Sequence, residues 1–71
     1  SQQILIDALA HAIKRAQDGG SVRAGEPRHL AAMCLLITQS AIQSAQMVAP
    51  ILDSDALALE LAHSLNGYLK P

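Results

Sequence analysis

Residues 30–37, LAAMCLLI, contain no polar side chain, and this run strongly limits how a chain of 71 residues can fold. A helix that is apolar all round needs neighbours on every side. A domain of this size, however, buries only about 60% of the surface that its unfolded chain exposes. We therefore expect residues 30–37 to be buried on every side, and the chain to carry more apolar surface than it can cover alone.

The apolar residues are mostly of types that favour helices. Tyr68 is the only aromatic residue, and the remaining apolar content is mainly Ala, Leu, Ile, Val and Met. Most of these are good helix formers. No segment alternates apolar and polar residues with a period of two, which is the pattern of a half-buried strand. The sequence predicts one all-α domain.

Caps and breakers divide the chain into segments. We predict helices over residues 2–18, 27–48 and 54–69. Gly19-Gly20 ends the first, because glycine adopts the left-handed conformation that closes a helix. Pro27 is tolerated at the first helical position of the second. Asp53 supplies a capping oxygen for the third.

The second and third predicted helices carry small and apolar residues at heptad spacing, the pattern of a helix–helix contact. The candidates for a contact with a second subunit are Thr38, Ala41, Ala45, Val48, Leu57, Leu61, Leu65 and Tyr68. Packing within the chain explains the same pattern, and both interpretations stay open at this point.

Another arc of the second predicted helix combines apolar side chains with two hydroxyl groups. Its members are Met33, Leu36, Ser40, Ser44 and Met47. Small-molecule sites are mostly apolar with a few placed polar groups, so this arc is a candidate ligand-binding wall. Packing against further helices of a longer protein is the alternative, and we favour that alternative.

The sequence contains no recognisable catalytic or metal-binding motif. His11, His29 and His63 lack further ligands at the spacing of a metal site. Cys34 lies in an apolar run rather than in the electropositive setting of a reactive thiol. No phosphate-binding glycine loop is present. We expect no enzymatic activity, no metal and no cofactor.

Charge and hydropathy restrict the partners. Five Lys and Arg residues face six Asp and Glu residues, with a net charge of −1 and no basic patch; free-standing nucleic-acid binders usually show such a patch. No apolar run approaches the ~20 residues of a membrane span, and no signal-peptide pattern is present. We expect a cytoplasmic protein whose 71 residues contact neither DNA nor a membrane.

Several local patterns occur in a characteristic order. The first predicted helix ends in GGSVR, within Ala16–Arg23, and Glu26-Pro27 follows as an acidic residue before proline. A helix rich in Ala, Leu and Met comes next, and the last predicted helix ends in Gly67-Tyr68-Leu69. This order and spacing resemble the C-terminal part of TetR-family transcriptional regulators, over nearly the whole chain.

The resemblance implies a three-helix fragment of a TetR-like C-terminal domain, spanning residues 1–71, without the family's N-terminal helix-turn-helix domain. It implies a homodimer in which the last two long helices of each subunit form an intermolecular helical bundle. It also implies part of a site for a small hydrophobic effector, with DNA bound only through the missing N-terminal domain.

Two other function classes fit the pattern less well. An autonomous small helical module for protein–protein interaction is the main alternative, and a helix-turn-helix upstream of Ser1 would decide against it. An acyl-carrier protein is disfavoured, because Asp55 follows Asp53-Ser54 where a carrier has leucine, and because the charge is nearly balanced.

Overall fold

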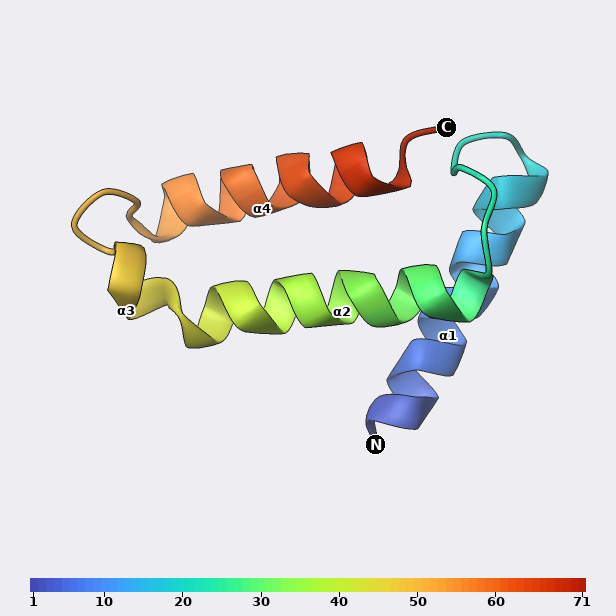
Figure 1. Cartoon of the computed structure of the whole chain (residues 1–71), viewed down its shortest axis with the longest axis horizontal. Coiled ribbons are helices and arrows are strands. Elements are labelled where there is room, and N and C mark those ends of the chain that lie inside the picture. The colour runs from blue at the N-terminus through green and yellow to red at the C-terminus, as the bar shows by residue number, and fades with distance from the viewer.

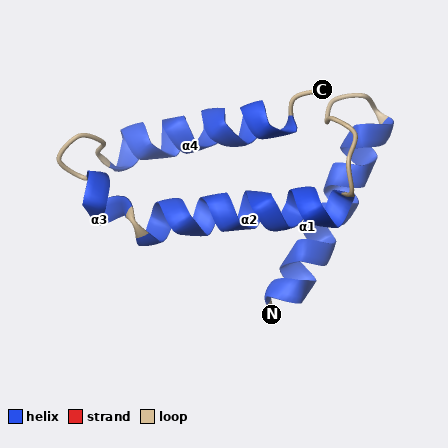
Figure 2. Ribbon diagram, in the orientation of Figure 1, coloured by secondary structure: helices blue, strands red, loops and turns tan.

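The computed structural model describes all residues, 1–71, and is helical throughout, apart from connecting turns and the chain ends (Figures 1 and 2). The elements are α1 (Gln2–Asp18), α2 (Pro27–Gln43), α3 (Ala45–Val48) and α4 (Ser54–Leu69). The predicted all-α class is confirmed. The bounds of the first and third predicted helices agree with those of α1 and α4.

The prediction of one helix over residues 27–48 is wrong at its C-terminal end, because Ser44 separates α2 from the short α3. The Ser44 N–H still bonds the Ser40 carbonyl, but the Met47 N–H bonds the Ser44 carbonyl, only three residues back, at 3.0 Å. Such bonds tighten a helical turn. Pro50 follows and has no N–H to continue an α-helical ladder.

The helices form an open arrangement rather than a closed bundle. α2 packs on both α1 and α4; α4 runs antiparallel beside α2, while α1 crosses the N-terminal end of α2 (Figure 1). The thinnest extent is 15 Å, and the radius of gyration is 13.3 Å, against about 11 Å for a compact chain of this length. Most of the α2–α4 pair is therefore a single layer with two open faces.

The core is small and lies where α1 crosses α2. The buried residues are Ala10, Ile13, Leu30, Ala31 and Cys34. Partly buried side chains that pack against it include Ile6, Leu9, Val22, Tyr68 and Leu69. No residue of α4 is buried. The hydrophobic contribution to folding is thus concentrated at one end of the molecule.

The expectation that residues 30–37 are buried on every side is wrong for this chain. Met33 is 40% exposed and Leu36 is 58% exposed. No element of the chain buries these two side chains, although Leu36 borders a cavity that residues of α1 also line. The surplus of apolar surface expected from the sequence is, by contrast, present.

Loop 19–26, which joins α1 to α2, closes the ends of both helices. After α1, the Ser21 N–H bonds the Ala16 carbonyl at 2.9 Å and the Gly20 N–H bonds the Gln17 carbonyl at 3.0 Å. Gly20 has φ +84°, so these bonds form a Schellman motif with glycine in the left-handed conformation. Before α2, the Glu26 carboxylate accepts the Arg28 N–H at 3.1 Å.

Candidate assembly and ligand surfaces

A groove lies between α2 and α3 on one side and α4 on the other. Its cavity has a volume of about 390 Å³, and its lining residues are Ala41, Ile42, Ala45, Gln46, Ala49, Leu52, Asp53, Ser54, Leu57, Ala58 and Leu61. We call this the α2–α4 groove. Asp53 caps α4 by accepting the Ala56 N–H at 2.8 Å, which places the start of α4 at one end of the groove. Alanines on α2, α3 and α4 leave the groove unfilled.

All eight residues predicted for a subunit contact are half-buried in the chain alone. Ala41, Ala45, Leu57 and Leu61 line the α2–α4 groove. Thr38 donates from its hydroxyl to the Cys34 carbonyl at 2.9 Å, within its own helix. Val48, Leu65 and Tyr68 do not line the groove. Packing within the chain therefore accounts for part of the heptad pattern, and the contact with a second subunit stays a prediction.

The residues of the predicted ligand-binding wall are all exposed. Met47 is 78% exposed, and Ser40 and Ser44 are exposed as well. Leu36 lines a cavity of about 220 Å³ between α1 and α2, which the other four residues do not line. The chain by itself does not bring the five residues into one concave site, and ligand binding stays a prediction.

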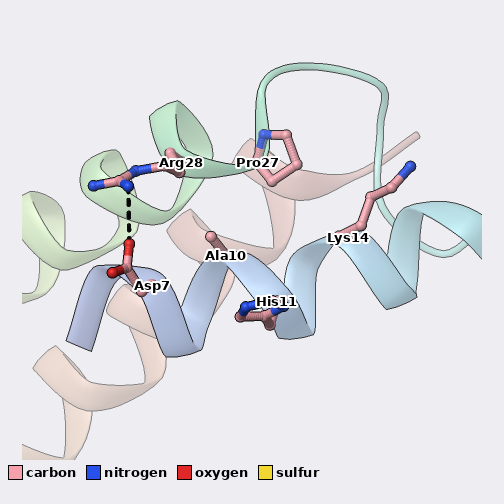
Figure 3. A pocket seen from close by; sticks show the side chains of 6 residues that line it. All are labelled: Asp7, Ala10, His11, Lys14, Pro27 and Arg28. Carbon is pink, nitrogen blue, oxygen red and sulfur yellow. Dashed lines mark ion pairs between the residues drawn. The ribbon is translucent and has the colours of Figure 1, made fainter. Parts of the chain in front are cut away.

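A further cavity, lined mostly by polar residues and with a volume of about 390 Å³, lies where α1 meets the start of α2 (Figure 3). Its lining residues are Asp7, Ala10, His11, Lys14, Pro27 and Arg28. Arg28 Nη1 lies 3.0 Å from Asp7 Oδ1, and both side chains are about half exposed. Exposed ion pairs contribute less than about 1 kcal/mol to the free energy of unfolding. This pair therefore links α1 to α2 but stabilises the fold little.

The side chains on which catalysis or metal binding could depend are dispersed. No group of three or more His, Cys, Asp or Glu residues lies close enough together to hold a metal ion. Asp7 pairs with Arg28 rather than with His11. Burial raises the pKa of the Cys34 thiol, which disfavours the thiolate that a nucleophile requires. None of the helices is both long and apolar enough to cross a membrane.

Arg23 makes the contacts that sequence reasoning missed. Its Nε–H donates to the Tyr68 carbonyl at 2.8 Å, and its backbone N–H donates to the Leu69 carbonyl at 2.9 Å. The guanidinium also lies over the Tyr68 ring, 4.7 Å from the centroid. We call the two hydrogen bonds the Arg23 cap. The GGSVR pattern contained this residue, but no local pattern links it to a position 45 residues later.

The chain is similar to part of several longer curated proteins. They are uncharacterized HTH-type transcriptional regulators of Mycobacterium tuberculosis, strains CDC 1551 and H37Rv, and of Mycobacterium bovis. Each is 62% identical over 69 residues, which cover 97% of this chain and 36% of the relative. The chain thus spans little more than a third of the length of these relatives. No protein-family model and no solved structure matches it.

Proposed function

We propose that this chain is part of the C-terminal domain of a TetR-like transcriptional regulator and that it forms a homodimer through α2 and α4. The observation that carries the dimer is the open α2–α4 layer, in which no residue of α4 is buried. The names of the relatives support a regulator. The order of GGSVR, Glu26-Pro27 and the Gly67-Tyr68-Leu69 ending supports a TetR-like one.

The exposed area is large enough to include a standard protein–protein interface. The accessible surface is 5030 Å², whereas a compact monomer of this mass exposes about 4250 Å². The difference, about 800 Å², matches the area that each partner contributes to a standard interface. A second copy laid against the α2–α4 layer would bury this excess and complete a four-helix bundle.

One large exposed side chain at the α2–α4 groove supports the same face. Ile42 is 67% exposed and lines the groove. Exposed apolar side chains that border a groove are typical of protein contacts, and two copies related by a two-fold axis would pack Ile42 of each subunit against the groove of the other.

The other open side of α2 suits the sensing part of such a domain. Met33, Leu36 and Met47 lie there with the hydroxyls of Ser40 and Ser44. Helices from the rest of a longer regulator would cover this arc and complete a pocket for a small hydrophobic effector. DNA binding would belong to a helix-turn-helix domain elsewhere in that cytoplasmic protein.

Sedimentation equilibrium of the 71-residue chain tests the dimer. We expect a folded dimer at tens of micromolar, and a folded monomer there would contradict the proposal. A gel-shift experiment tests the domain assignment, because the chain alone should not shift duplex DNA. A sequence-selective, salt-sensitive shift by these residues would overturn that assignment.

A further inference from the structure

The C-terminal end of α4 has no cap of its own. The last turn of α4 contains no basic residue, and the following Lys70 is in an extended conformation, with φ −62° and ψ 133°. The last carbonyls of a helix have no partner within the helix. Here the carbonyls of Tyr68 and Leu69 receive their donors from the Arg23 cap, that is, from the loop before α2, which lies beside the C-terminal end of α4 (Figure 1).

The loop that carries Arg23 is itself held on α1. The Gln17 side-chain amide donates to the carbonyls of Arg23 and Gly25, both at 3.0 Å. Gly25 has φ +153°, and a Cβ there would lie 3.5 Å from Arg23 Nη1 and 3.6 Å from the methyl groups of Leu30. These are ordinary contact distances, so a side chain at this position would be strained by the backbone conformation and not by a lack of space.

We propose that Arg23 is a positioning residue that fixes the C-terminal end of α4 against α1 and, through α4, controls assembly. The second half of this inference rests on the proposed dimer. No side chain of α4 is buried, so besides the Arg23 cap its C-terminal end is held by the packing of the half-buried Tyr68 and Leu69 against the core. A displacement of α1 would pass through Gln17 and Arg23 to Tyr68, and so to the helix on which the second subunit packs.

Two measurements on the chain separate the two halves of the proposal. Amide hydrogen exchange in the last turn of α4 reports on the helix end, and sedimentation equilibrium reports on the dimer dissociation constant. Arg23→Ala removes the side-chain donor and the cation above the Tyr68 ring. Arg15→Ala is the control, since it removes an exposed arginine from the last turn of α1 that makes no hydrogen bond or ion pair with α4.

We expect Arg23→Ala to accelerate exchange in the last turn of α4 at least tenfold, as expected for loss of a charge-assisted hydrogen bond, and to weaken the dimer. Arg15→Ala should change neither. Gln17→Ala keeps the guanidinium but frees the loop, and it should act in the same direction with a smaller effect. It also decides the matter if Arg23→Ala does not fold.

Three results would overturn the inference or part of it. Unchanged exchange in Arg23→Ala and Gln17→Ala would show that Arg23 does not position α4. Faster exchange with an unchanged dimer dissociation constant would refute the link to assembly. A wild-type chain that stays monomeric would refute the proposed dimer and the link together, while the exchange comparison would still decide the role of Arg23.

Discussion

Arg23 and Tyr68 meet twice, through a hydrogen bond of 2.8 Å to the Tyr68 carbonyl and through the guanidinium stacked 4.7 Å from the centre of its ring. The hydrogen bond caps the C-terminal end of α4, and the stacked contact places the guanidinium on the face of the aromatic ring. Tyr68 and Leu69 also pack against the small core, so this pair joins the C-terminal end of α4 to the best-packed part of the molecule.

Replacing the Tyr68 ring tests the stacked contact separately from the hydrogen bond. Tyr68→Leu keeps the backbone carbonyl but removes the ring, and we expect the free energy of unfolding to fall by about 0.5–1 kcal/mol for the lost cation–π contact. Tyr68→Phe keeps the ring face and should stay within about 0.5 kcal/mol of wild type. Urea unfolding at one fixed chain concentration measures both, and equal losses in the two variants would assign the effect to the hydroxyl.

Two glycines should respond to alanine with opposite signs. Gly25→Ala forces a side chain into φ +153° beside Arg23 and Leu30, and we expect a loss of about 1–3 kcal/mol. Gly67 lies inside α4 with open space at its Cβ position. Gly67→Ala should therefore stabilise the chain by roughly 0.5–1 kcal/mol. Thermal unfolding monitored by circular dichroism checks both signs.

Leucine substitutions distinguish the two sides of α2 and α3. Ala41 and Ala45 line the α2–α4 groove, which the second subunit fills in the proposed dimer, so Ala41→Leu and Ala45→Leu should occupy that space and weaken the dimer by about 1–3 kcal/mol. Ser40 and Ser44 are exposed and do not line the groove. Ser40→Leu and Ser44→Leu should leave the dimer dissociation constant nearly unchanged.

Helicity serves as the folding control for these four variants. If the serine variants break the dimer and the alanine variants do not, the second subunit packs on the opposite side of α2. If none of the four changes the dissociation constant, the contact lies elsewhere, with α4 as the remaining candidate.

Cys34 should be protected and should make stability depend on alkaline pH. Only 7% of the residue is exposed, and burial raises the pKa of its thiol above the ordinary value of 9.0. The folded chain therefore holds this proton more tightly than the unfolded chain. The contribution of the buried, protonated thiol to the free energy of unfolding is complete below the pKa of the unfolded thiol. This contribution is lost as the pH rises through the pKa of the folded thiol.

Thiol alkylation and urea unfolding at several pH values measure these effects. Iodoacetamide should modify Cys34 slowly in the folded chain and at the rate of a free thiol in guanidinium chloride. Cys34→Ala should show a smaller decrease in stability at alkaline pH than wild type. Rapid alkylation of the folded chain would contradict the burial of this residue.

Local signals in the sequence were sufficient for most helix ends. Asp53 is the cap of α4, as expected, and Pro27 begins α2. The sequence did not predict the break at Ser44, because the spacing of apolar residues continues through it. The break consists of a local change in hydrogen bonding, from carbonyls four residues back to carbonyls three residues back. Here the hydrogen-bond pattern, and not the hydrophobic pattern, ends the helix.

Surface and long-range contacts were harder to predict. The eight candidate contact residues from Thr38 to Tyr68 follow heptad spacing, which cannot tell a partner within the chain from one outside it. The structure places the two helices that carry most of them, α2 and α4, side by side. The sequence predicted full burial of residues 30–37 because the run is apolar on all sides. The sequence pattern does not show how many helices are available to cover those sides. Arg23 was noticed only as part of GGSVR, since its partner is supplied by the fold.

Loop 19–26 is engaged at three helix ends: it closes α1, starts α2 and caps α4. Surface loops usually accept insertions and deletions between related proteins. This loop is different, because a residue added before Arg23 would move Arg23 away from Tyr68, and one added after it would disturb the bond from Gln17 to Gly25 or the Glu26 cap of α2. Its length is therefore under the same kind of constraint as a core side chain, and evolutionary change here should proceed by substitution.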